Sequence, residues 1–138
     1  MQLQKHLRTI QLLDALTAGS TTDNNPSATV DLTGYVGLRA RCTVGSVSTA
    51  VTLTVQTSTS TTAGDFSSVT SAATAASTVS NIEHIVDVYR PTKRHARVLL
   101  NSTGGNLSGP VMVDLYGARA LPTTNGSTSV VEAIVVST

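Results

Sequence analysis

Apolar and polar residues alternate over much of the chain, which is the pattern of β-strands with one buried face. Between residues 82 and 121 three such runs follow one another, within 86–89, 96–101 and 111–116. Proline and other turn residues lie in both connections, and neither connection has room for a crossover helix. This segment therefore predicts an antiparallel β-meander.

Two more runs alternate strictly, at 35–44 and 50–57, and a Gly45-Ser46 turn separates them, which predicts a hairpin. Residues 28–32 predict a short strand. Near the N-terminus one set of residues has helical spacing (Leu3, Leu7, Ile10 and Leu13) and another fits a strand (Thr9, Gln11, Leu13 and Ala15). We favour a strand over 9–16 because a long turn follows it.

The remaining segments are harder to assign. Residues 58–80 are rich in Ser, Thr and Ala, which favours a long loop with one short strand, while 72–77 also suits a helical turn. Residues 129–138 are apolar on both faces, as in a strand that is buried on both sides or lodged against a partner. Residues 1–8 are a possible N-terminal arm.

These runs add up to seven or eight strands with the spacing of an antiparallel sandwich or barrel, and 138 residues suit a single domain, 1–138. No run of about 18 apolar residues predicts a membrane span, and the N-terminus lacks the pattern of a secretory signal. The alternation predicts a core made of Val36, Leu38, Ala40, Val51, Leu53, Val55, Val86, Val88, Val98, Leu100, Val113 and Leu115.

The amino-acid composition limits the classes of function that we expect for this chain. Thr and Ser make up 39 of the 138 residues, so hydroxyls rather than ions dominate the expected surface. A net charge of +1 is too small to hold a polyanion, so we expect no nucleic-acid partner. The single Cys42 excludes an intrachain disulfide and fits a small buried hydrophobe.

No residue pattern predicts catalysis. His6, His84 and His95 have no second ligand at a metal-binding spacing, and the chain has no nucleophile-elbow sequence and no glycine-rich loop that leads into a helix. We therefore expect no enzymatic activity, no cofactor and no metal site.

Charge gathers at two places, the 90–97 connection and the N-terminal arm. Such a cluster is either a solvated turn or a docking tip that meets the carboxylates of a partner through paired hydrogen bonds. A weak phosphate site is a further alternative. On the docking interpretation the partner-binding residues are Lys5, Arg8, Arg90, Lys93, Arg94 and Arg97.

Three features carry a resemblance: the opening TIQLLDALTA at 9–18, the Ser/Thr-rich middle, and the segment from Tyr89-Arg90 to 116–119 that leads into Leu121-Pro122. With them the chain resembles the small cement or decoration proteins of tailed bacteriophage heads, in particular those of Bordetella-type short-tailed phages. The resemblance implies a jelly roll of about eight strands, self-association, and binding to the major capsid protein on the outer capsid surface of the virion. It carries over no functional residues.

On this basis we expect a structural protein that is made in the bacterial host cytoplasm and clamps capsid subunits, with a homodimer favoured over a trimer and no membrane partner. The alternative is a carbohydrate- or receptor-binding β-module of a virion or cell surface. That alternative needs an exposed aromatic platform, and the chain has no Trp, one Phe and three Tyr.

Overall fold

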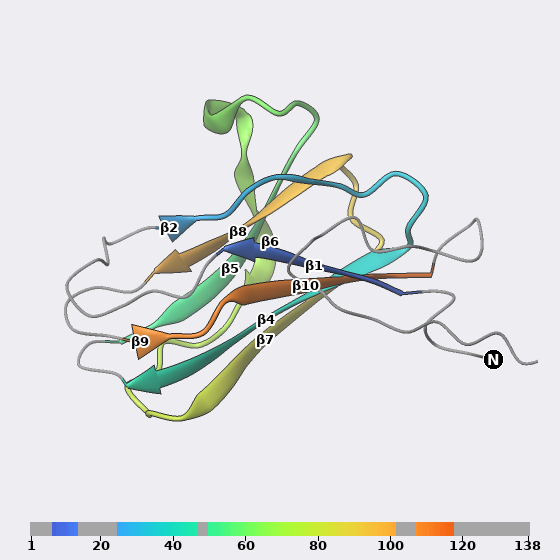
Figure 1. Cartoon of the computed structure of the whole chain (residues 1–138). Helices are drawn as coiled ribbons and strands as arrows, with labels where there is room; N and C mark the ends of the chain where they lie inside the picture. Colours follow the sequence, from blue (N-terminus) through green and yellow to red (C-terminus); the bar gives the residue numbers. More distant parts are fainter. Residues whose placement is uncertain (1–6, 14–24, 47–49, 102–106, 118–138) are drawn as a thin grey trace, which may run out of the picture.

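The computed structural model describes residues 7–13, 25–46, 50–101 and 107–117. In these ranges ten strands form two antiparallel sheets that lie face to face (Figure 1). A 3-10 turn, η2, covers Ala63–Asp65. The strands are β1 (Arg8–Leu13), β2 (Asn25–Pro26), β3 (Val30–Asp31), β4 (Gly37–Ser46), β5 (Thr52–Ser58), β6 (Ser67–Ala73), β7 (Ile82–Tyr89), β8 (His95–Asn101), β9 (Leu107–Ser108) and β10 (Val111–Tyr116).

The strand order identifies the fold. One sheet runs β1-β10-β4-β7, with β9 also on β4, and the other runs β2-β8-β5-β6, with β3 also on β8. Because β2 and β3 pair with successive parts of β8, and β9 and β10 with successive parts of β4, the described strands occupy eight positions. In sequence order the first strand pairs with the last, and the pairing continues toward the middle of the chain. The pairs are β1 with β10, β2 and β3 with β8, β4 with β7, and β5 with β6. This order is a jelly roll, so the predicted antiparallel β-sandwich of jelly-roll type is confirmed.

The predicted meander over 82–121 is wrong, although its three strands exist. β7 and β10 flank β4 in one sheet, and β8 belongs to the other sheet, so none of the three pairs with another. The predicted hairpin between 35–44 and 50–57 is wrong for the same reason, because β4 and β5 lie in different sheets. A connection of a few residues suffices to cross the gap of about 10 Å between packed sheets, so loop length alone does not distinguish a hairpin from a crossing.

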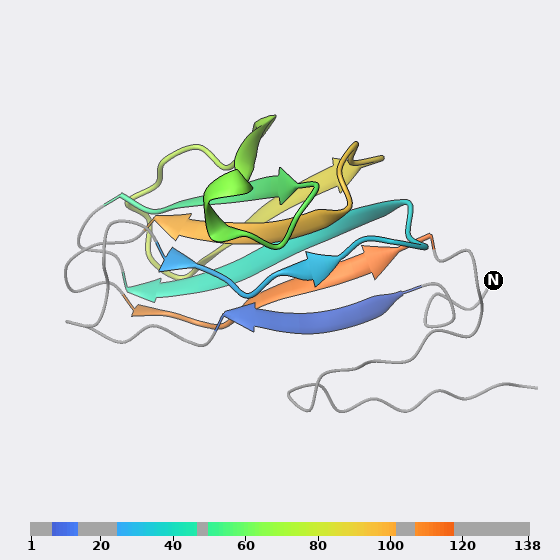
Figure 2. The ribbon, with the colours of Figure 1, turned by 90° about the horizontal axis from the view of Figure 1, so that it is seen from above.

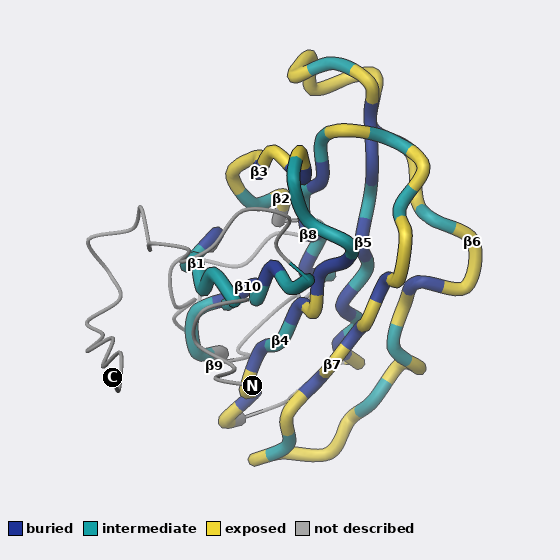
Figure 3. Tube along the Cα trace, turned by 90° about the vertical axis from the view of Figure 1, so that its right-hand side faces the viewer, coloured by how far each residue is buried: buried dark blue, intermediate teal, exposed yellow. Residues whose placement is uncertain are grey.

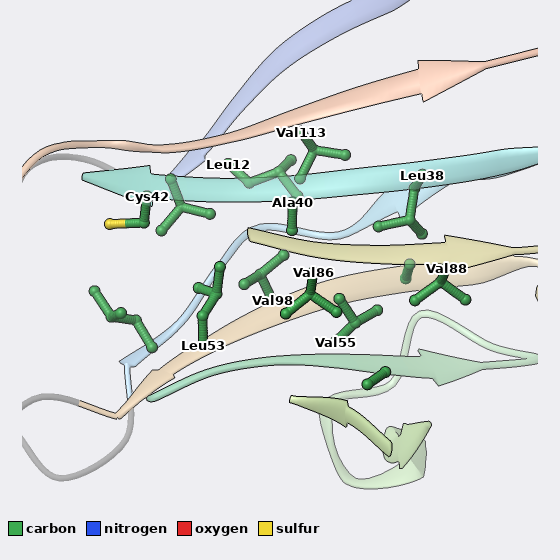
Figure 4. Packing of buried hydrophobic residues seen from close by; sticks show 14 of the residues in the cluster. Leu12, Leu38, Ala40, Cys42, Leu53, Val55, Val86, Val88, Val98 and Val113 are labelled. Carbon is green, nitrogen blue, oxygen red and sulfur yellow. The ribbon is translucent and has the colours of Figure 1, made fainter. Parts of the chain in front are cut away.

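Alternate residues of both sheets fill the space between them, as Figure 4 shows for Leu38 and Ala40 of β4 opposite Leu53 and Val55 of β5. Eleven of the twelve predicted core residues are buried. Val36 is the exception, because it lies in the loop before β4 and is half-buried there. Along β7 buried and exposed residues alternate at the sheet edge (Figure 3).

The segment 58–80 contains a strand and no helical turn at 72–77. Its predicted short strand is β6, which pairs with β5, and Ala72 of β6 is buried. The helical turn at 72–77 is therefore wrong, because pairing with β5 outweighs the helix preference of alanine. Residues 14–16 of the predicted N-terminal strand, residues 1–6 of the arm and the predicted strand at 129–138 lie outside the described residues.

Candidate partner-binding surface

Two loops lie together at one end of the sandwich, residues 32–36 between β3 and β4 and residues 90–94 between β7 and β8 (Figure 2). Backbone hydrogen bonds join them at both ends. The Arg90 N–H donates to the Val36 carbonyl at 2.9 Å, and the Leu32 N–H donates to the Arg94 carbonyl at 2.8 Å. We call these two segments the loop pair, and the bonds between them hold it as one unit.

A forked ion pair fixes one side of the loop pair. Arg94 Nε lies 3.1 Å and Nη2 lies 2.7 Å from Asp31 Oδ2, and the Thr33 N–H donates to Oδ1 of the same carboxylate at 2.9 Å. The hydrogen bonds from Arg94 hold the pKa of Asp31 well below its usual range, and the carboxylate raises the pKa of Arg94. The charge of Arg94 is thus balanced within the chain, while both side chains stay exposed enough for water to weaken the pair.

Two other predicted residues also bind within the chain. Arg97, on the outer face of β8, donates from Nε to Gln56 Oε1 at 2.8 Å, and its guanidinium lies 4.5 Å from the centre of the Phe66 ring. Such stacking of a cation on an aromatic face is favourable. Lys93 Nζ donates to Ser67 Oγ at 2.9 Å. These contacts anchor the basic segment to the β5–β6 region.

The remaining predicted residues differ in their placement. The Arg90 guanidinium lies 5.2 Å from the centre of the Tyr89 ring, and both residues are exposed. Arg8 begins β1 and pairs with Leu115, which places it at the same end of the sandwich but in another strand. Lys5 lies outside the described residues. The structure therefore brings Arg90, Lys93 and Arg94 together in the loop pair.

Two hollows open on the loop pair. One, of about 360 Å³, is lined by residues 32–35 and 91–94, and the other, of about 370 Å³, is lined by Tyr35, Val36, Arg90 and Pro91. Tyr35 and Pro91 belong to both, so the two hollows adjoin. The residues that line them include no carboxylate and three cations, of which Arg94 is paired with Asp31 and the other two are Arg90 and Lys93. This surface suits an anionic partner group.

Sequence reasoning missed a second polar cluster, on the outer face of the β1-β10-β4-β7 sheet. Arg39 Nε lies 3.5 Å from Asp87 Oδ2, and Arg41 Nε lies 3.3 Å from Asp114 Oδ2. Thr9 Oγ1 donates to Asp114 Oδ1 at 2.7 Å. The two arginines alternate with core residues, so their outward direction was readable from the sequence, but their partners depend on the strand register.

Tyr116 completes this sheet-face cluster. Its hydroxyl donates to Asp87 Oδ1 at 2.6 Å, and its ring lies across Gly37, where a Cβ atom would collide with it. Burial, together with the neighbouring Asp87 carboxylate, raises the pKa of Tyr116. Leu7, Arg39, Asp87, Asp114 and Tyr116 line a hollow of about 310 Å³ there. Since its acids and bases meet one another, we assign this cluster to sheet cohesion.

A buried histidine joins the two sheets at their β6–β7 side. The Leu53 N–H donates to Thr74 Oγ1 at 3.0 Å, and Thr74 Oγ1 lies 2.9 Å from His84 Nδ1. This contact links Thr74, which follows β6, to β7 whichever ring nitrogen carries the proton. His84 is 4% exposed, and burial lowers its pKa.

We therefore expect that lowering the pH decreases the free energy of unfolding, because protonation of His84 is less favourable in the folded chain than in the unfolded chain. Its folded pKa lies below the unfolded value of about 6.5, so the neutral ring stabilises the fold above that pH, and the stability falls as the pH drops below it. The loss is limited to about 1.4 kcal/mol per pH unit for one proton. The measurement is urea unfolding from pH 7.5 to 5.0 for the wild type and His84→Gln. A variant with the same pH slope as the wild type would contradict this role.

The described residues hold no group of three or more His, Cys, Asp or Glu side chains placed to bind a metal ion. Cys42 is 1% exposed, as predicted for a small buried hydrophobe. Within the described ranges no helix has the length and apolar character needed to cross a membrane. No family model matches the chain, and a search of curated proteins found no significant match. The case for a function therefore rests on the surface itself.

Proposed function

We propose that this chain is a structural virion protein that binds the outside of a phage head and clamps neighbouring subunits of the major capsid protein. In this proposal the protein is made in the host cytoplasm, has no enzymatic activity, and works as a homo-oligomer, a homodimer rather than a trimer. The observation that carries the proposal is the basic loop pair, held by its own hydrogen bonds at one end of a sandwich whose interior is filled.

A filled sandwich with a rigid end suits a clamp. The largest core side chains, such as Leu38, Leu53 and Leu100, have no exposed surface, so the body of the domain is a firm support. The loop pair is already ordered by the bonds at Val36 and Leu32, so docking does not have to order it. Many copies on one shell multiply a modest contact, because each bound copy holds several subunits near one another.

The aromatic residues support this function over a carbohydrate- or receptor-binding module. All four lie within the described ranges. Phe66 is buried, Tyr35 is half-buried, and Tyr116 lies across Gly37. Tyr89, at 63% exposed, is the aromatic residue that stands out into solvent. A sugar-binding platform generally needs more stacking surface than one ring offers.

The proposal is tested by measuring how much protein rebinds to purified heads that have been stripped of it, over a series of salt concentrations. We expect the wild type to bind and Arg90→Gln/Lys93→Gln to lose on the order of 2 to 5 kcal/mol of binding free energy. Each removed cation would leave a partner carboxylate unpaired in a partly buried interface. Binding of the wild type should also weaken with salt more steeply than binding of the variant.

The matched control is Arg39→Gln/Arg41→Gln, which removes the same charge from the sheet face and leaves the loop pair intact. We expect it to bind as the wild type does. Equal binding by all three proteins at every salt concentration would remove the loop pair from the interface. Failure of the wild type to bind any head would refute the cement function itself.

A further inference from the structure

Arg90 has an unusual backbone for its residue type. Its φ is +52°, and the other non-glycine residues with positive φ in the described ranges are Ser71 and Asn81. Asparagine tolerates this left-handed region, whereas arginine does not gain from it and glycine would adopt it without strain. Pro91 follows, and a proline further restricts the residue before it to extended conformations.

The surroundings hold Arg90 in this conformation. Its N–H is bound to the Val36 carbonyl at 2.9 Å, so the chain turns here from β7 into the loop pair. A strained residue that persists where glycine would serve the backbone better points to a use for its side chain. That side chain is exposed, lines one of the two adjoining hollows, and has the Tyr89 ring beside it.

The two adjoining hollows form one groove, which Arg90 borders and whose lining residues are of several chemical kinds. Tyr35 and Pro91 lie between the two hollows and offer apolar surface, while Thr33 and Thr92 offer hydroxyls along the first hollow. Asp31, the acid nearest in the chain to the 32–36 loop, is held by Arg94. The positive charge of Arg94 is therefore balanced, whereas no acid among the lining residues balances Arg90 or Lys93. The preformed loops leave little to be ordered on binding.

We propose that this groove binds an extended acidic segment of a partner protein, with Tyr35 and Pro91 packed against the segment and Arg90 paired with one of its carboxylates. This inference rests on the proposed function for the identity of the partner, the capsid subunit, and adds the chemistry of the segment that the partner presents. The planar guanidinium suits a carboxylate because it donates two parallel hydrogen bonds to it.

The test is a titration of the full ¹⁵N-labelled chain with a twelve-residue peptide of repeated Asp-Glu-Ser, followed by NMR. The peptide in which Asn and Gln replace Asp and Glu is the uncharged control. We expect the acidic peptide to shift the amide signals of Thr33, Tyr35, Thr92 and Lys93, with an affinity that falls as salt is added. The uncharged peptide should bind at least tenfold more weakly.

Arg90→Gly separates binding from folding. Glycine relieves the strained backbone, so we expect a melting temperature no lower than that of the wild type together with at least a tenfold loss of affinity for the acidic peptide. Asn81→Gly is the matched control, because it changes another residue with positive φ, 58°, outside the groove. It should bind the peptide as the wild type does.

Absence of acidic-peptide binding by the wild type, equal binding by Arg90→Gly, or signal shifts confined to residues outside the groove would overturn the inference. A short single-stranded DNA that binds the groove more tightly than the acidic peptide would overturn it as well. The two proposals fail separately. If the peptide binds the groove but the wild type binds no phage head, the cement function fails alone, and if heads bind Arg90→Gly as well as wild type, the acidic groove fails alone.

Discussion

Truncation of Leu53 to alanine is expected to lower the free energy of unfolding by about 2 to 5 kcal/mol. Leu53 is the second residue of β5, has no exposed surface and pairs with Leu100 of β8. Its backbone exchanges hydrogen bonds with Thr74, through the Thr74 N–H and Oγ1, so neighbouring chain is held in place and cannot collapse freely into the space left behind. The loss therefore includes a cavity as well as the buried apolar surface.

Urea unfolding followed by circular dichroism measures this loss. Thr54→Ala is the matched control, since it truncates the next residue of the same strand, where the side chain is half-buried on the other face. We expect a loss below about 1 kcal/mol there, as is usual for substitutions outside the core. Similar losses for the two variants would contradict the assignment of the β5 inner face to the core.

Substitution of Gly117 by alanine is expected to cost about 2 to 5 kcal/mol of stability, from two additive sources. Gly117 has a φ of +65°, a conformation that L side chains rarely adopt. A Cβ atom there would also lie 2.7 Å from Val36 Cβ, closer than packed carbon atoms approach. Val36 is held in turn by hydrogen bonds to Tyr116 and Arg90, so it cannot easily move away.

Gly34→Ala separates the two sources. Gly34 has a φ of +88°, but a Cβ atom there would meet nothing within 4 Å, so only the backbone cost of about 1 to 2 kcal/mol applies. Thermal and urea unfolding of both variants give the comparison. Equal losses for Gly34→Ala and Gly117→Ala would show that the contact with Val36 carries no energy.

The alternation of residues predicted the faces of the strands but not their partners. The inner residues of β4, β5, β7, β8 and β10 follow from period two alone, because a strand sends successive side chains to opposite sides. Pairing is a long-range property. The connection through 90–94 looks like a hairpin in sequence, and only the register with β4 shows that β7 stays in one sheet while β8 enters the other.

The candidate site was predicted in part for a similar reason. The run from Arg90 to Arg97 is visible as a local cluster of charge, and three of its cations do lie together in the loop pair. The residues that bind cations of this run are distant in sequence, as Asp31 is from Arg94 and Gln56 is from Arg97. Composition cannot reveal such pairs. The sequence therefore could not distinguish Arg90 from Arg94 and Arg97, which bind Asp31 and Gln56 within the chain.

We propose that the protein sits on the outside of a phage head and bridges neighbouring capsid subunits. The most direct measurement is electron cryomicroscopy of stripped heads after the wild-type protein has been added back. We predict density for the sandwich across subunit boundaries on the outer surface, with the loop pair of residues 32–36 and 90–94 turned toward the shell. Heads that show no added density, or density that touches the shell only through the far end of the sandwich, would contradict it.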